Sequence, residues 1–202
     1  DAQPSGTNYW QNGKRVTEGL DGDDSRVIMD RAIPFIEDAA GKKTPFLAVI
    51  WFHAPHLPVV AGKEYTRAFS DLSPYARHYY GCLTAMDVQI GRLRSTLDSL
   101  AIADNTIVWF CSDNGPEGNS SAPGTTGGLR GRKRSLYEGG VRVPGIVCWP
   151  GRVRTGSASS VPATTSDCLP TIAAAIGARL DPDRVLDGIN ILGILDGDTS
   201  SR

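Results

Sequence analysis

Two runs of consecutive apolar residues place the tightest limit on how this chain can fold. They are F-L-A-V-I-W-F at residues 46–52 and T-I-V-W-F-C at residues 106–111. Runs of this length without polar alternation are typical of strands that are buried on both faces, as in a parallel sheet covered by helices. Residues 141–149 predict a third strand.

Helical patterns separate the predicted strands. Apolar side chains recur at helical spacing over residues 24–40, where Pro34 should introduce a kink. Ser73 and Pro74 predict the N-cap and first turn of a long helix that ends near Leu100. A shorter helix is expected at residues 167–176. Strand and helix therefore alternate, which predicts an α/β fold with a mostly parallel sheet flanked by helices.

The remaining segments read as loops and linkers. Residues 1–23 are polar and Gly-rich, residues 112–140 form a long Gly-rich loop, and residues 151–165 are rich in Ser, Thr and Gly. The chain after residue 177 is rich in turn signals, among them Asp187-Gly188.

Composition excludes several classes of function. The chain has 202 residues, is 40% hydrophobic and carries a formal net charge of -1, which argues against a generally basic nucleic-acid-binding protein. No stretch approaches the roughly 20 apolar residues that a membrane helix needs. The four cysteines form no C-x-x-C pair, so they fit buried apolar side chains better than a zinc or redox site.

Polar clusters follow two of the predicted strands. H-A-P-H-L-P at residues 53–58 follows the first, and S-D-N-G-P at residues 112–116 follows the second. Ligands of open α/β sheets bind beyond the carboxyl ends of strands. Asp113 and Asn114 offer the oxygen donors that Ca²⁺ or Mg²⁺ prefers, although the same residues also favour a simple turn. His53 and His56 are either site residues or structural histidines.

A third cluster is basic. Within the Gly-rich segment 127–140, four cations lie within five positions at Arg130, Arg132, Lys133 and Arg134. Such a segment can wrap an anion, with a solvated basic loop and a nucleic-acid patch as the alternatives. It lacks the residue order of a P-loop. A divalent cation, a basic loop and an imidazole together suit phosphoryl or sulfuryl transfer.

In this order, the motifs resemble those of the sulfatase family, which has an alkaline-phosphatase-like α/β fold. The resemblance runs from about residue 20 to residue 195 and includes G-L-R-G-R-K-R-S-L-Y-E-G-G-V-R-V-P at residues 128–144 and S-D-C-L-P-T at residues 166–171. It implies that Asp113 and Asn114 coordinate a Ca²⁺ or Mg²⁺ ion. It also implies that Lys133 and His56 contact the sulfate and act in catalysis, and it assigns no role to His53.

Two features of the family pattern are missing. Sulfatases use a formylglycine made from Cys or Ser in a C/S-x-P-S-R motif, together with two adjacent aspartates near their N-terminus. Asp23-Asp24 precedes a helix and is interpreted as a helix cap. Cys148 begins C-W-P-G-R, but a Ser/Gly-rich linker follows it instead of a helix, so it is interpreted as structural.

We therefore expect residues 1–202 to be the central and later part of a sulfatase catalytic domain. The N-terminal nucleophile segment and the small C-terminal domain are expected to be absent, in agreement with a chain that begins at Asp1 instead of Met. The piece alone should be inactive, and its sheet should present an unpaired apolar edge.

The expected activity is hydrolysis of sulfate esters on a sulfated small molecule or glycan. The alternatives are a phosphodiesterase or phosphonate hydrolase of the same superfamily and a non-catalytic module that binds sulfated glycans. The resemblance also suggests an exported or lysosomal protein. The particular ester and the oligomeric state are not indicated by the sequence.

Overall fold

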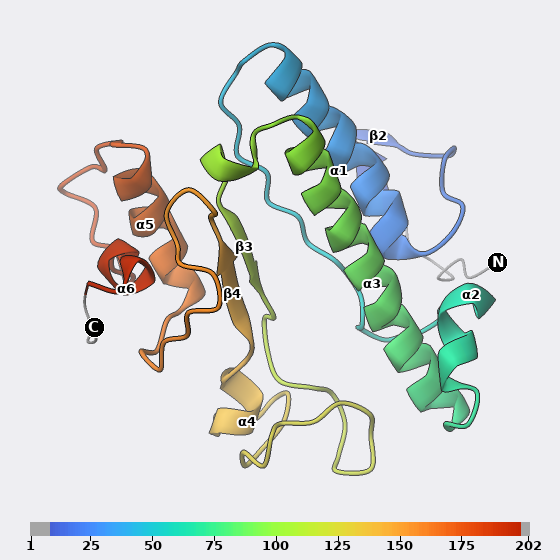
Figure 1. Ribbon diagram of the computed structural model, residues 1–202. Helices are drawn as coiled ribbons and strands as arrows, with labels where there is room; N and C mark the ends of the chain where they lie inside the picture. Colours follow the sequence, from blue (N-terminus) through green and yellow to red (C-terminus); the bar gives the residue numbers. More distant parts are fainter. Residues whose placement is uncertain (1–8, 199–202) are drawn as a thin grey trace. The chain divides into compact units, whose positions relative to one another are not determined.

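A computed structural model describes residues 9–198 of the chain (Figure 1). They divide into two compact units. The first unit contains the described residues up to Ile102 together with Cys111–Pro144. The second unit contains Ala103–Phe110 and the described residues from Gly145 onward. The predicted alternation of helix and strand is found only in part, because no strand separates the helices between residues 24 and 99.

Two long helices, α1 (Asp24–Gly41) and α3 (Pro74–Ser99), form the frame of the first unit and pack against each other (Figure 1). The short helix α2 (Lys63–Thr66) and the 3-10 turn η1 (Arg67–Phe69) pack against α3. The apolar residues buried in these elements are Val27, Met29, Ile33, Ile36, Ala39, Ala85 and Leu97. The amphipathic pattern of each helix therefore places its apolar face in one shared core.

The starts of both long helices confirm the predicted caps. One carboxylate oxygen of Asp23 accepts hydrogen bonds from the backbone N–H groups of Ser25, at 2.9 Å, and Arg26, at 3.2 Å. Ser73 caps α3 in the same way through the N–H of Ala76. Helix α1 continues through Pro34 to Gly41.

The predicted strand at residues 46–52 is wrong for the part of the chain that the structure describes. The segment is extended but pairs with no strand there. Its even-numbered residues are half-buried, and the ring of Phe46 packs edge-on against Phe35 of α1, with ring centroids 6.2 Å apart. Leu47, Val49 and Trp51 face outward and are 67%, 67% and 83% exposed.

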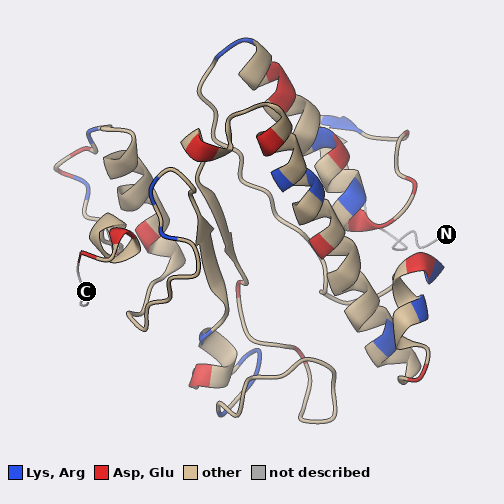
Figure 2. Ribbon diagram, in the orientation of Figure 1, with Lys and Arg blue, Asp and Glu red and all other residues tan. Residues whose placement is uncertain are grey.

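The error has a plain physical cause. Burial on both faces requires a second covering layer, and the described residues cover one face only. Figure 2 shows that the segment carries no charge along its length. It thus has the unpaired apolar character expected of a sheet edge, without being paired in a sheet itself.

The second unit is built on two predicted strands. Strand β3 (Val108–Cys111), whose last residue belongs to the first unit, pairs with β4 (Gly145–Cys148) in a two-stranded sheet. The helix expected at residues 167–176 is α5 (Cys168–Ala175), preceded by the 3-10 turn η3 (Thr165–Asp167). Asp167 is fully buried and joins this turn to a later segment through the N–H of Ile189, at 2.9 Å.

Several short elements were not predicted. Within the expected loop of residues 1–23, of which residues 1–8 lie outside the description, β1 (Trp10–Gln11) and β2 (Lys14–Arg15) form an antiparallel hairpin. The 3-10 turn η2 (Ala103–Asn105) and the helices α4 (Glu138–Val141) and α6 (Leu192–Asp196) are also short. None of the helices within residues 9–198 is both long and apolar enough to cross a membrane.

Candidate functional site

The S-D-N-G-P turn at residues 112–116 leaves the end of β3 and is held against α4. The N–H of Gly115 donates to the carbonyl of Gly140, at 2.8 Å. A side chain at Gly115 would collide with the carbonyl oxygen of Gly139. Only glycine allows the two backbones to approach this closely.

The E-G-G segment is packed just as tightly against the basic loop. The N–H of Gly139 donates to the carbonyl of Arg130, at 2.7 Å. A Cβ at Gly139 would collide with the carbonyl oxygen of Gly131, and one at Gly140 with that of Ser135. Turn 112–116, helix α4 and residues 130–135 therefore form three stacked layers of backbone.

This stacking brings Lys133 to the turn that carries Asp113 and Asn114. The N–H of Lys133 donates to the carbonyl of Pro116, at 3.1 Å. Its ammonium group, on a side chain that is mostly buried, lies 4.0 Å from a carboxylate oxygen of Glu117. Two of the three predicted clusters thus belong to one structural assembly in the first unit.

The arginines of the basic loop have structural partners, which the sequence did not reveal. Arg132 donates to the carbonyls of Glu117, Pro123 and Gly124, at 2.9–3.1 Å. Arg134 pairs with the Glu117 carboxylate, and the guanidinium of Arg130 lies 3.8 Å from the centre of the Tyr137 ring.

Glu117, to which the sequence assigned no role, organises this loop. The hydrogen bond from Arg134, followed by that from the N–H of Gly118, holds the pKa of the Glu117 carboxyl below its usual range. An acidic residue a few positions after S-D-N-G, opposite a run of cations, is the signal that could have identified it.

Asp113 and Asn114 differ in their surroundings. The Asp113 side chain is exposed, whereas Asn114 donates from its amide nitrogen to the carbonyl of Gly115, at 2.9 Å, which leaves its amide oxygen as an acceptor. Two adjacent oxygen donors fit a hard divalent cation. Within residues 9–198 no group of three or more His, Cys, Asp or Glu side chains could complete a metal site. These two residues can therefore supply only part of a ligand set.

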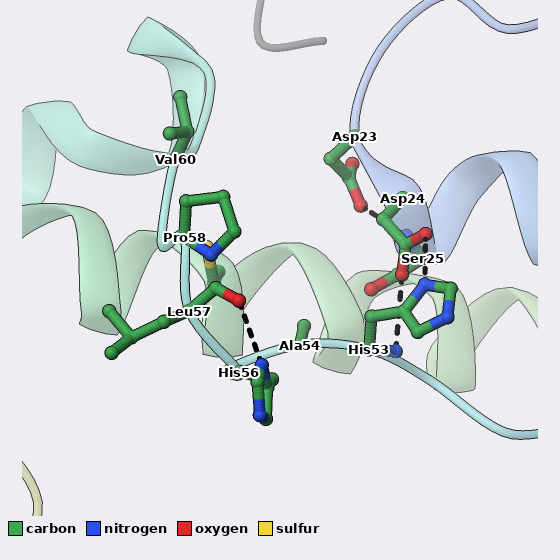
Figure 3. Close-up of a pocket in the computed structure, with 10 residues that line it drawn as sticks. Asp23, Asp24, Ser25, His53, Ala54, His56, Leu57, Pro58 and Val60 are labelled. Atoms are coloured by element: carbon green, nitrogen blue, oxygen red, sulfur yellow. Dashed lines mark hydrogen bonds and ion pairs between the residues drawn. The ribbon is translucent and has the colours of Figure 1, made fainter. Parts of the chain in front are cut away.

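The loop of residues 53–58, which carries His53 and His56, lines a pocket of about 200 Å³ in the first unit (Figure 3). The N–H of His56 donates to the carbonyl of His53, at 2.7 Å, so both histidines belong to one tight turn. Nδ1 of His53 lies 2.8 Å from the Asp24 carboxylate, and Nδ1 of His56 lies 2.7 Å from the carbonyl of Leu57. The remaining lining residues include Asp23, Ser25, Pro58 and Cys82.

Helix α3 connects this pocket with the loop that holds Lys133. Cys82 of α3 lines the pocket. Tyr79 lies one turn earlier on the same helix and packs closely against Gly124, where an added Cβ would lie 2.8 Å from the Tyr79 hydroxyl. Residues 23–82 supply the whole described lining of the pocket, so neither Asp113 nor Lys133 belongs to it.

The C-W-P-G-R segment has the local structure of a turn. Cys148 is the last residue of β4 and is followed directly by turns, not by a helix. Arg152 makes two hydrogen bonds to Asp196, at 2.7 and 2.5 Å, and its guanidinium lies 5.2 Å from the centre of the Trp149 ring. Trp149 in turn donates to the carbonyl of Asp104, at 3.2 Å. These contacts agree with the structural interpretation of Cys148.

Comparison with known proteins identifies what this arrangement resembles. A family model described as Sulfatase matches residues 1–178. The steryl-sulfatase of Rattus norvegicus is 35% identical over 167 residues, which is 77% of this chain and 27% of that protein. The N-acetylgalactosamine-6-sulfatase of the same species is 31% identical over 176 residues, or 83% of this chain and 32% of that protein.

Solved structures agree with these matches. The crystal structure of Ps i-CgsB in complex with k-i-k-neocarrahexaose superposes with a TM-score of 0.87 at 33% identity, over 95% of this chain and 42% of that one. The expected α/β fold of alkaline-phosphatase-like type is thereby confirmed. A phosphonate monoester hydrolase at 20% identity shares the fold alone, and neither alternative function is favoured. The chain spans about a quarter to a third of the length of the curated relatives named above.

Proposed function

This chain belongs to the sulfatase family, and from that premise we propose that the whole protein hydrolyses sulfate esters. The observation that carries the proposal is the stacked backbone assembly. It places Lys133 beside the turn of Asp113 and Asn114 through the hydrogen bond to Pro116. A cation and a pair of metal-binding oxygens in one rigid assembly suit an oxyanion such as sulfate.

Asp113 and Asn114 would hold the metal ion that the family uses, and we propose Ca²⁺ or Mg²⁺ because both side chains present oxygen donors. When bound, such an ion offsets the negative charge on the sulfate oxygens. Lys133 would add a second positive charge to the same oxygens. The hydrogen bond from the backbone N–H of Lys133 to the carbonyl of Pro116 fixes the backbone at this position and so restricts where the ammonium group can lie.

His56 is the proposed histidine contact to the sulfate. A backbone carbonyl is an acceptor only, so Nδ1 of His56 carries a proton when it bonds to Leu57. Sulfate oxygens are acceptors too. His56 can therefore donate to the sulfate through Nε2 only as the imidazolium.

We propose that residues 1–202 are the central and later part of the catalytic domain, with the formylglycine contributed from elsewhere in the protein. The chain shows no C/S-x-P-S-R motif, and the nearest match, at Cys148, lies in a turn whose arginine is paired with Asp196. The small C-terminal domain would likewise lie elsewhere. Sulfated sugars or other sulfated small molecules are the proposed substrates.

The test compares the full-length protein with the 202-residue chain on 4-nitrophenyl sulfate, with Ca²⁺, with Mg²⁺ and with EDTA. We expect metal-dependent sulfate release by the full-length protein and none by the chain alone. Faster release from bis(4-nitrophenyl) phosphate than from the sulfate would contradict the proposed reaction. Robust turnover by the chain alone would contradict the proposed division of the catalytic domain.

A further inference from the structure

The carboxylate of Glu117 is shared between two cations of the basic loop. Its oxygen Oε1 accepts hydrogen bonds from the guanidinium of Arg134 and from the backbone N–H of Gly118, the second at 2.9 Å. Its other oxygen, Oε2, lies 4.0 Å from the ammonium nitrogen of Lys133. The two hydrogen bonds hold the pKa of the Glu117 carboxyl below its usual range, so the group is ionised at neutral pH. One oxygen is thus anchored, and the other faces the lysine that the proposed reaction uses.

The contact between Glu117 and Lys133 is suited to orienting the lysine without occupying it. A separation of 4.0 Å is too long for a hydrogen bond, so it uses none of the three N–H donors of the ammonium group. The Lys133 side chain is 20% exposed and that of Glu117 is 29% exposed, and partly buried charges are screened less than exposed ones. The carboxylate therefore attracts the ammonium group and leaves its donors for another acceptor.

The backbone of both residues is also fixed. The N–H of Lys133 donates to the carbonyl of Pro116, at 3.1 Å, and Arg132 donates to the carbonyl of Glu117, at 2.9 Å. The freedom that remains lies in the long, flexible side chain of Lys133. The position of its ammonium group therefore depends on the charge that it meets at Oε2.

Arg134 holds the anchored oxygen from an unusual backbone conformation. Its φ is +72°, in the left-handed region that residues other than glycine adopt at a cost. Its side chain is 70% exposed, so packing in the core offsets little of this cost. The charged hydrogen bond from its guanidinium to Glu117 does offset it, and the same bond keeps Oε1 away from Lys133.

We propose that Glu117 is the positioning residue of Lys133, and that Arg134 keeps it in that role by reserving one of its oxygens. This inference rests on the proposed sulfatase function, in which Lys133 contacts a sulfate oxygen. Without Glu117, the ammonium group would lose its fixed position but would meet one negative group fewer. Without Arg134, both carboxylate oxygens could turn to Lys133 and compete with the sulfate for it. The two losses should therefore affect the binding of sulfate differently.

The test measures turnover and sulfate binding separately in the full-length protein. We expect Glu117→Gln to lower kcat for 4-nitrophenyl sulfate by about tenfold or more, because a misplacement of about 1 Å can cost about 100-fold. The Kd of inorganic sulfate, measured by calorimetry, should not rise. Arg134→Gly, in which glycine suits the left-handed backbone, should raise that Kd by about two- to fivefold, the scale of one exposed ion pair. Glu37→Gln, at an exposed residue of α1, is the control for the lost charge and should change neither value.

A double-mutant cycle shows whether Glu117 acts through Lys133. In the Lys133→Ala protein, adding Glu117→Gln should change kcat/KM by less than about twofold, because the group that it positions is gone. Losses that multiply in the double variant would overturn the inference. Weaker sulfate binding in Glu117→Gln, which a loop that had lost its structure would show, would overturn it too. Hydrolysis of no sulfate ester by the unaltered protein would contradict the proposed function instead, and the two Kd values would still test the inference.

Discussion

At the scale of single residues, the four cations of the basic loop divide by what they contact. Arg132 and Arg134 bind groups of the loop itself, and Arg130 lies against Tyr137. Lys133 makes one weak contact, 4.0 Å from Glu117. Lys133 is therefore the cation with the fewest partners inside the protein, which suits contact with an external anion. The contacts of the three arginines hold the loop in place around it.

Replacing Lys133 by Ala in the full-length protein should lower kcat/KM for 4-nitrophenyl sulfate by about 100-fold, because one aligned electrostatic group contributes about 3 kcal/mol to the transition state. Lys42→Ala is a suitable control, since Lys42 pairs with Asp38 on the exposed side of α1. Steady-state kinetics of the two variants make the comparison. An unchanged rate in Lys133→Ala would show that this lysine does not act on the sulfate.

Asp113 can be tested by binding alone. Asp113→Ala removes one of two adjacent oxygen ligands, so calorimetric titration of the full-length protein should show Ca²⁺ or Mg²⁺ affinity lowered by about tenfold or more. Even outer-shell partners of metal ligands cost about 10–100-fold in affinity. Asp38→Ala provides the same change of charge away from the site. Equal affinity in both variants would remove Asp113 from the ligand set.

At the scale of elements, the helices could be predicted because their signals are local. The cap at Ser73, Pro74 in the first turn and apolar steps of three and four residues together determine α3. The strand at residues 46–52 could not be predicted correctly. Its apolar run indicates two covered faces, and coverage depends on segments that are distant in sequence. The same reason explains why the partners of the loop arginines could not be predicted, since an ion pair such as Arg134–Glu117 joins positions 17 residues apart.

The turn after β4 and helix α6 should show a measurable dependence on pH. The hydrogen bonds from Arg152 hold the pKa of Asp196 below its usual range. A carboxyl whose pKa is lower in the folded state stabilises that state above its ordinary pKa, about 3.9 for Asp, and loses this contribution as the pH falls through the folded value. Arg152→Gln should therefore lower the urea midpoint at pH 7 and lower it by less at pH 3.

Arg154→Gln is the matched control for this measurement, because Arg154 is exposed on the same turn-rich segment. Its urea midpoint should follow the unaltered chain at both values of pH. If Arg152→Gln lowered the midpoint by the same amount at both, packing of the guanidinium on Trp149, and not the ion pair, would explain its contribution.

At the scale of the whole molecule, the extended segment 46–52 presents an apolar face that the described residues leave uncovered. Three apolar side chains on its outer face are at least two-thirds exposed, and the backbone of the segment has no strand partner within residues 9–198. Because the curated relatives are about three to four times as long as the matched region, a full-length protein has ample chain with which to cover such a face. The loops with the proposed site residues follow this segment and β3 directly, so covering it also restricts where the histidine turn can lie.

The exposed face should make the isolated chain self-associate, because an unpaired apolar edge is a template for pairing with other chains. In analytical ultracentrifugation, Val49→Lys should reduce this association. Val185→Lys, at an apolar residue that is 92% exposed and lies in the second unit, should not. In the full-length protein Val49→Lys should be destabilising, because it would bury an unpaired charge and lower the free energy of unfolding. Val185→Lys should leave the free energy of unfolding nearly unchanged. A full-length protein that tolerates both substitutions equally would show that the segment remains uncovered.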